Sequence, residues 1–488
     1  MRPIRGQVGT AVVLVFAMAH MPGRSLEAQD LLRDSRVSDA INLLDRWVEA
    51  QQAYEQFPGI SVGVIYDQTL LWAKGFGLAD VESGRPATPE TVYSICSISK
   101  LFTSVAAMRL VDQGRLTLDA PVDRVLPWFK VAADRAETQR VSLRTLLTHT
   151  SGLKEDIGTP PNAKPYLYWA TSAELRALLP KEELRHRPGS HYTYSNIGMA
   201  LVGEMVAQVS GQRFKDYVTE QILRPLGMLS TSPDIGDVWK SGSVAAGYGP
   251  VRRGGGRTRV EAFRSKGMAP AMGFASTLLD LAKFTSWQFR LLDGRDEVLR
   301  PGTLLDMYRA QFVDSIAGVT QGLGFAIYKE DADEFVGHGG FCPGFQSDLS
   351  IDLERRLAAV ALANSMMPAW EFTARVHEIM APAIDAASRN PAGSRPTPED
   401  LHRYIGTYEG FPWSGEWQVI PWDGSLAIIR LPVDDPMEVL RPLEHSKGGE
   451  FRVIEDDGSL GMKVTFEPDA SGAIVRMVTD NYPRARIR

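Results

Sequence analysis

A serine and a lysine three positions apart, Ser97 and Lys100, are the part of this sequence best suited to chemistry. Residues at this spacing share one face of a helix, with β-carbons roughly 5–6 Å apart, so the lysine amine can reach the serine oxygen. An amine held against a hydroxyl can activate it as a nucleophile without a histidine. Alone the pattern is common, and a serine near a helix start beside a solvated lysine explains it equally well.

The residues that follow supply the element needed to position this pair. Apolar side chains recur at helical spacing after Ile98 and predict a helix that stops near Gly114. Ser97 then lies in the first turn, where free backbone N–H groups and the helix dipole stabilise negative charge on a bound acyl oxygen. The apolar positions are Leu101, Phe102, Val105, Ala106, Met108 and Leu110.

Two later motifs carry further polar groups. Tyr194 and Asn196 are two positions apart, so in an extended segment both side chains project to the same side. The glycines of residues 337–345 let a ligand approach the backbone closely, and the N–H of Phe341 would join that of Ser97 in a two-donor oxyanion hole. Taken alone, each motif also has a purely structural explanation. The first could be a buried tyrosine beside a turn asparagine, and the second a glycine-rich turn.

Taken in order and at these separations, S-x-x-K, Y-x-N and H-G-G resemble the serine β-lactamase and penicillin-binding-protein family, most closely its class C-like branch. The resemblance covers about residues 35–385. It implies an α/β (α+β) fold in which an antiparallel sheet is flanked by helices and joined by an all-α region. It also implies Ser97 as the acylated nucleophile, Lys100 as its activating partner and Tyr194 as the base that relays protons. The oxyanion and substrate-binding positions that it implies are Ser97, Phe341, Asn196, His338, Gly339 and Gly340.

The third motif departs from the family pattern. His338 stands where typical β-lactamases have the lysine of a K-T-G strand, and His338-Gly339-Gly340 offers a titratable ring and no hydroxyl to hold a substrate carboxylate. Relatives with similar strands include D-aminopeptidases, D-peptidases and carboxylesterases. We therefore expect an exported serine hydrolase that cleaves a peptide, a D-amino-acid derivative or a carboxylester. The alternatives are a β-lactamase acting on antibiotics and a non-catalytic, penicillin-binding-like sensor.

Three smaller expectations concern the surroundings of the site. His149 is expected to bond its loop rather than to act in catalysis, and residues 272–274 either narrow the cleft or reflect ordinary packing. Cys96 precedes Ser97 and Cys342 follows Phe341, so two converging oxyanion donors would make the cysteines neighbours. A disulfide between them in an oxidising compartment is one hypothesis, and two buried thiols are the other.

Composition narrows the possible partners. The 488 residues are 44% hydrophobic and 23% charged, with a formal net charge of -6, which argues against nucleic-acid binding. The eight histidines and two cysteines show no metal-ligand spacing, so we expect no metal and no cofactor. A small-molecule or peptide substrate is the expected partner.

The N-terminus predicts export. Arg2 and Arg5 precede an apolar or small run over residues 8–19, which indicates a signal peptide over residues 1–28. An uncleaved anchor or a buried helix is the alternative. We expect a periplasmic or secreted protein with no stable membrane span after processing.

The remaining sequence divides into a hydrolase domain at 29–388, a breaker-rich linker at 389–398 and an antiparallel barrel at 399–488 that resembles a lipocalin-like module. The barrel either associates with copies of the chain, as a homo-oligomer, or caps the cleft. Predicted helices span residues 37–48, 199–209 and 278–292. Predicted strands span residues 60–66, 70–76, 322–329, 345–352 and 357–364, and in the barrel 406–410, 416–421, 426–431, 450–454, 463–467 and 473–479.

Overall fold

The computed structural model describes residues 28–157, 168–239, 242–330 and 332–488, so the predicted signal peptide lies outside the described residues apart from Ala28. A nine-stranded antiparallel sheet forms the centre, in the order β3-β2-β1-β11-β10-β9-β8-β7-β6. Its strands are β1 (Gly59–Tyr66), β2 (Thr69–Asp80), β3 (Arg85–Pro86), β6 (Phe312–Asp314), β7 (Val319–Gln321), β8 (Ala326–Glu330), β9 (Asp333–Cys342), β10 (Phe345–Asp352) and β11 (Leu357–Ala363).

Strand β11 shows why the sheet needs a layer on each face. It is apolar throughout, and successive side chains of a strand point to opposite faces. Ala358, Val360 and Leu362 belong to the hydrophobic cluster on the α3 side, whereas Ala359 and Ala361 belong to the cluster beneath α2 and α14. Both faces of the central strands are therefore buried.

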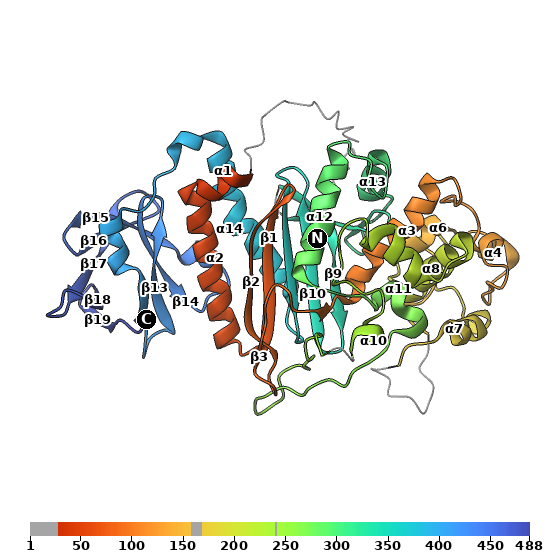
Figure 1. The fold of residues 1–488 in the computed structure, drawn as a ribbon, viewed down its shortest axis with the longest axis horizontal. Coiled ribbons are helices and arrows are strands. Elements are labelled where there is room, and N and C mark those ends of the chain that lie inside the picture. The colour runs from red at the N-terminus through yellow and green to blue at the C-terminus, as the bar shows by residue number, and fades with distance from the viewer. Residues whose placement is uncertain (1–27, 158–167, 240–241, 331) are drawn as a thin grey trace, which may run out of the picture.

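Helices cover the two faces (Figure 1). Helices α2 (Ser35–Tyr54) and α14 (Ala369–Arg389) pack together on one face, and the short α1 (Ala28–Arg33) precedes α2 at one end. The all-α region lies on the other face and carries α3, the helix that follows Ser97. It contains α3 (Ser99–Asp112), α4 (Val122–Val125), α5 (Arg135–Thr138), α6 (Leu143–Leu147), α7 (Ser172–Leu178), α8 (Asn196–Ser210), α9 (Phe214–Val218), α10 (Ile235–Val238), α11 (Ala269–Met272), α12 (Leu278–Leu292) and α13 (Pro301–Tyr308), with the two-stranded pair β4 (Tyr93–Ser94) and β5 (Ala275–Ser276).

The C-terminal residues form an eight-stranded antiparallel barrel. Its strands are β12 (Gly406–Glu409), β13 (Glu416–Trp422), β14 (Ser425–Leu431), β15 (Arg441–Lys447), β16 (Glu450–Ile454), β17 (Leu460–Pro468), β18 (Ile474–Thr479) and β19 (Tyr482–Ala485), paired in chain order. A bridge between Tyr408 and Arg486 brings the two ends of this sheet together. The predicted fold class is confirmed in both of its parts.

The barrel packs against α2 and α14 on the side of the sheet away from α3 (Figure 1). Trp47 Nε1 of α2 donates to the Val433 carbonyl over 2.8 Å, and Ile429 and Leu431 of β14 join the hydrophobic cluster of these helices. Because two helices and the sheet separate it from Ser97, the barrel does not cap the cleft of its own chain.

Most predicted elements are present, and the differences have local causes. Of the strand predicted at 322–329, only residues 326–329 form a strand, as part of β8, because Gly324 adopts a φ of 86° and turns the chain between β7 and β8. Strands β15 and β19 were not predicted, because neither RPLEHSK nor YPRA alternates apolar with polar residues. Their neighbours in the sheet define them as strands.

Candidate active site

Ser97, the predicted nucleophile, lies in a tight turn at the start of α3, called the nucleophile turn below. Cys96–Ile98 form one 3₁₀ turn, and α3 begins at Ser99. Cys96 adopts a φ of 48°, an unfavourable conformation for a residue with a β-carbon that persists only where neighbours impose it. One such contact is the Ser99 hydroxyl, which donates to the Cys96 carbonyl over 2.5 Å. Ser97 is thereby turned toward the helix face that carries Lys100.

Lys100 is fully buried and donates to three acceptors. Its Nζ lies 3.0 Å from Ser97 Oγ, 2.7 Å from Asn196 Oδ1 and 2.8 Å from the Ala271 carbonyl. Ala271 is in the short α11, where the last carbonyls have no partner within the helix and attract a cation. The contact between the Lys100 amine and the Ser97 oxygen that the sequence predicts is therefore present.

Burial makes this lysine a base near neutral pH. Loss of hydration lowers the pKa of Lys100 to about 7, while the nearby carboxylates of Asp156 and Glu155 act to raise it. When the amine loses a proton, Asn196 and Ala271 can keep its two remaining N–H groups, and the lone pair then points to Ser97 Oγ. The two fixed acceptors aim the base at the serine.

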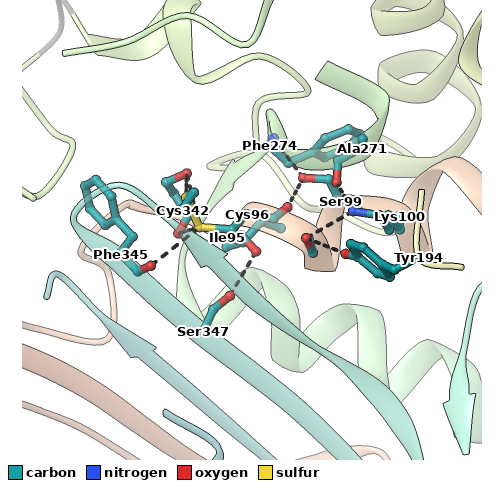
Figure 2. Close-up of a disulfide and its surroundings, with 12 residues drawn as sticks. Ile95, Cys96, Ser99, Lys100, Tyr194, Ala271, Phe274, Cys342, Phe345 and Ser347 are labelled. Carbon is teal, nitrogen blue, oxygen red and sulfur yellow. Dashed lines mark hydrogen bonds between the residues drawn. A yellow bond between two sulfur atoms is a disulfide. The ribbon is translucent and has the colours of Figure 1, made fainter. Parts of the chain in front are cut away.

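Tyr194 approaches Ser97 from the other side. Its hydroxyl donates to Ser97 Oγ over 2.8 Å, and burial raises the pKa of this phenol well above its ordinary value. The ring also lies beneath Lys100 Nζ, 4.7 Å from the ring centroid. In the resting protein Tyr194 is therefore a proton donor, and Lys100 is the group able to accept a proton. Figure 2 shows the two side chains next to each other.

Asn196 reaches the site differently from the prediction. The segment was predicted to be extended, but Ser195 caps α8 with its hydroxyl, and Asn196 is the first helical residue. Its side chain still converges with that of Tyr194, because Oδ1 accepts from Lys100 and Nδ2 donates to both carboxylate oxygens of Asp156 at 3.2 Å. Asn196 thus links Lys100 to Asp156.

His149 holds the loop that carries Tyr194, as predicted. Its Nδ1 accepts the backbone N–H of Ser195 at 3.1 Å, its carbonyl accepts from Thr193, and its ring lies 4.6 Å from that of Tyr194. Burial and the charge of Lys100 hold the pKa of His149 well below its usual range. The ring is therefore neutral and structural.

The glycine-rich motif lies on β9, beside the nucleophile turn. A β-carbon on Gly340 would lie 2.5 Å from the Ile95 carbonyl, and one on Gly339 would lie 3.2 Å from a carboxylate oxygen of Asp348. Only glycine therefore lets β9 approach the turn closely at position 340. Phe341 follows with an exposed side chain.

His338 does not supply a cation at this edge. Its Nδ1 donates to the Gly339 carbonyl over 2.5 Å, and its ring centroid lies 6.1 Å from that of Tyr194. Burial and the charge of Lys100 lower the pKa of His338 to about 4. At neutral pH this position offers an uncharged imidazole.

A disulfide joins Cys96 to Cys342, in agreement with the first of the two hypotheses, and ties the nucleophile turn to the end of β9 (Figure 2). The attachment is reinforced on both sides. Ser347 Oγ of β10 donates to the Ile95 carbonyl over 2.9 Å, and the Ile95 N–H donates to the Phe274 carbonyl over 3.0 Å. The turn is therefore fixed to the sheet by covalent and hydrogen bonds.

A cleft of about 560 Å³ opens beside this constellation and shares Asn196 and Phe341 with it. Its walls are mostly apolar and aromatic, with two carboxylates, and the described residues that line it include no lysine or arginine. The lining is Glu155, Asp156, Ile157, Tyr168, Trp169, Ala170, Asn196, Gly249, Pro250, Val260, Met268, Met272, Phe341, Cys342, Pro343, Gly344 and Met366. Met272 is thus a wall of the cleft, whereas Phe274 is buried behind it.

Three residues that contribute to the site were not predicted from the sequence. Asp156 and Glu155 influence Lys100 by charge, and Ala271 contributes only a backbone carbonyl. Every residue has a backbone carbonyl, so residue type cannot indicate that the Ala271 carbonyl binds Lys100. Asp156 lies within residues 35–385, which resemble the family, but it belongs to none of the three motifs that carry the resemblance.

Comparison with known proteins agrees with this geometry. Residues 44–383 match the family model described as Beta-lactamase. Protein flp of Staphylococcus aureus (strain N315) is 31% identical over 195 residues, covering 40% of this chain and 39% of that protein. Mouse "Serine beta-lactamase-like protein LACTB, mitochondrial" is 31% identical over 242 residues, covering 36% of this chain and 44% of the relative. The match thus spans only about two fifths of the length of these curated relatives.

Two solved structures share the fold. The octameric penicillin-binding protein homologue from Pyrococcus abyssi has a TM-score of 0.61 at 23% identity and covers 91% of this chain and all of its own. D-amino acid amidase from Ochrobactrum anthropi, complexed with D-phenylalanine, has a TM-score of 0.61 at 24% identity, over 71% of this chain and 99% of its own. A buried serine and lysine beside a partly buried tyrosine on this fold define a serine-hydrolase-like protein. This chain belongs to the beta-lactamase family.

Proposed function

We propose that this protein is an exported serine hydrolase that cleaves an amide or ester through an acyl-enzyme on Ser97. The observation that carries the proposal is the position of Ser97 Oγ, 3.0 Å from Lys100 Nζ and 2.8 Å from the Tyr194 hydroxyl. One partner can take the serine proton, and the other can donate a proton to a leaving group.

The proposed reaction balances in two stages. Ser97 attacks the substrate carbonyl as Lys100 takes its proton, the backbone N–H groups of Ser97 and Phe341 stabilise the oxyanion, and Tyr194 protonates the departing amine or alcohol. Water then attacks the acyl-enzyme as the Tyr194 phenolate takes its proton, and Lys100 returns a proton to Ser97. The acid is released, and all three side chains regain their starting states.

The cleft favours a substrate that carries an amine. Glu155 and Asp156 line it together with Trp169 and Phe341, and His338 is neutral where typical β-lactamases have the lysine that helps to hold a carboxylate. A carboxylate would meet like charge, whereas an ammonium group on an apolar or aromatic residue would meet opposite charge and apolar walls. We therefore propose amino-acid amides or short peptides with a free amine, including D-amino-acid derivatives, ahead of β-lactams. The fold neighbour complexed with D-phenylalanine is consistent with this preference.

Export is supported by the predicted signal peptide and by the disulfide, since disulfides persist chiefly in oxidising compartments. No helix among the described residues is long and apolar enough to cross a membrane. Association of copies, as in the octameric Pyrococcus protein, is proposed on the likeness of fold and is tested by light scattering after size exclusion.

A substrate panel tests the proposal. Wild type and Ser97→Ala would be assayed with D- and L-phenylalanine amides, their N-acetyl derivatives, p-nitrophenyl esters and nitrocefin. We expect turnover of free-amine amides, weaker turnover of the acetylated forms, and no turnover by the variant. Equal activity of the two proteins would refute the assignment of Ser97. Covalent labelling of Ser97 without turnover would favour the sensor alternative, and preferred turnover of nitrocefin would favour the β-lactamase alternative.

A further inference from the structure

Two arginines on the outside of the barrel flank one tryptophan. The guanidinium carbon of Arg484 lies 4.4 Å from the ring centroid of Trp417, and that of Arg430 lies 5.6 Å from it. Within the described part of the chain neither arginine forms an ion pair with a carboxylate. Two cations are thus held against one ring without a counter-ion.

This arrangement has an energetic cost that an anion would relieve. Burial and the charge of Arg430 lower the pKa of Arg484, and Arg484 Nε is buried without a hydrogen-bond partner. Arginine does not lose its proton to escape such repulsion. A carboxylate or phosphate that accepts hydrogen bonds from both guanidinium groups would replace repulsion with attraction.

Exposed aromatic faces adjoin the arginines. Trp413 and Tyr482 are 79% and 60% exposed, and together with Ser414 they line the same hollow of about 280 Å³ as Trp417 and the two arginines. Single exposed hydrophobic residues are ordinary on protein surfaces. An exposed tryptophan and an exposed tyrosine beside two neighbouring arginines without counter-ions are not. Their faces are electron-rich and receive C–H groups of a ring, while the Ser414 and Tyr482 hydroxyls can bond to hydroxyl groups.

The charge of the barrel limits the size of the ligand. Residues 399–488 contain ten lysines and arginines against sixteen aspartates and glutamates. An anionic membrane or a long polyanion would meet net repulsion from this module, whereas a single sugar acid or a short oligosaccharide of a few acidic units meets mainly the arginine pair.

We propose that the hollow between Trp413, Trp417 and Tyr482 is a binding site for an acidic sugar, whose carboxylate or phosphate group is held by Arg430 and Arg484 and whose ring packs on the exposed aromatic side chains. The site is separate from Ser97 and does not depend on the proposed reaction. The same chemistry occurs in a free sugar acid and in one unit of a longer acidic glycan.

Binding to the full-length protein would be measured by isothermal titration calorimetry with glucuronate, tetragalacturonate, glucose, benzoate and inorganic phosphate. We expect glucuronate to bind at least tenfold more tightly than glucose, benzoate or phosphate. Arg430→Gln/Arg484→Gln should weaken glucuronate binding by roughly tenfold or more, because hydrogen bonds to charged groups are lost. Trp413→Ala should weaken it severalfold.

The matched control is Arg476→Gln, since Arg476 lies on the same barrel but is paired with Glu467. It should bind glucuronate as wild type does, and thermal unfolding would establish that every variant is folded. Tighter binding of tetragalacturonate than of glucuronate would identify a unit of a longer glycan as the ligand, and equal binding would identify the free sugar acid. Absence of glucuronate binding, an equal loss in Arg476→Gln, or equal binding of phosphate or benzoate with no effect of Trp413→Ala would overturn the proposal.

Discussion

Lys100 and the arginine pair around Trp417 are two opposite ways of placing positive charge in one protein. Lys100 is completely buried and has three acceptors, one of them Ser97 Oγ. Arg430 and Arg484 lie at the surface of the barrel, stack on a ring and have no carboxylate partner among the described residues. The Lys100 ammonium therefore has a hydrogen-bond acceptor for each of its N–H groups, whereas the two arginines have no carboxylate partner among the described residues.

The difference follows from the chemistry of the two side chains. An ammonium group responds to burial by losing its proton, so the pKa of Lys100 falls to about 7 and the amine becomes a base. A guanidinium group stays charged under the same conditions, so an unpaired arginine remains available to an anion. Burial therefore creates reactivity at one site, and permanent charge creates binding capacity at the other.

Removal of the base tests the first half of this comparison and has the largest expected effect. Lys100→Met should lower kcat/KM by about 10³-fold or more, close to the loss in Ser97→Ala, because the two side chains act as a unit. Amide hydrolysis by the folded variants, verified by circular dichroism, measures this. Activity of Lys100→Met within tenfold of wild type would show that Lys100 is not the base.

Removal of the proton donor comes next. Tyr194→Phe keeps the ring against His149 and Lys100 but loses the hydroxyl that donates to Ser97, so kcat should fall by about 10²–10³-fold. In the acylation step, measured as the pre-steady-state burst, the loss should be smaller for p-nitrophenyl esters, whose leaving group needs no proton. An equal loss for esters and amides would contradict the role of Tyr194 as proton donor.

Opening the disulfide tests whether the turn must be tied to β9. Cys96→Ala/Cys342→Ala should lower kcat by about 10–100-fold, since small displacements of a nucleophile are costly, and should lower the free energy of unfolding by about 2–5 kcal/mol. Steady-state kinetics and urea unfolding measure the two effects. A reductant should reproduce them in wild type and leave the double variant unchanged; an unaltered kcat in reduced wild type would assign the bond a purely structural role.

The pH profile gives a smaller effect. Acylation should rise with pH through about 7, where Lys100 loses its proton. The Asp156 carboxylate stabilises the ammonium form and so raises the pKa; Asp156→Asn should therefore move this rise to lower pH by roughly half to one unit. Asp480→Asn on the barrel removes the same charge and is the control. A shift to higher pH would reverse the assigned direction of coupling.

The smallest expected effect lies in the barrel and sharpens the contrast. Glucuronate affinity should stay constant within twofold from pH 5 to 9, because guanidinium groups keep their charge over this range. Titration calorimetry at several pH values measures this. A fall in affinity near neutral pH would place a different titrating group in the hollow.

Helices and strands with a regular spacing of apolar residues were predicted accurately from the sequence, and those without it were not. Helix α12 and strands β10 and β16 have the predicted bounds because each carries a regular apolar period. Strands β15 and β19 lack that period and are strands because barrel neighbours pair with them. Both partners are the adjacent strands of hairpins, so the extended conformation of β15 and β19 follows from backbone pairing and not from an apolar period of their own.

Some features of the candidate active site were predictable from the sequence, and others were not. The order of the motifs that contain Ser97, Tyr194 and His338 resembles the family, and this resemblance predicted acylation of Ser97 and the lack of a cation that holds a substrate carboxylate. The proton states were not predictable. They depend on burial, on the Ala271 carbonyl and on Asp156, which approaches Lys100 only after α8 and α11 have packed against α3.

The sequence by itself determined which groups are available: a hydroxyl, an amine, a phenol, two cysteines and a glycine where β9 passes the nucleophile turn. The tertiary structure decided how they behave. It excluded water from Lys100, brought Cys96 and Cys342 from 246 residues apart into one bond, and left Arg430 and Arg484 together at the surface. Residue type sets what a side chain can do, but hydration and neighbouring charge decide its protonation, and both exist only in the folded chain.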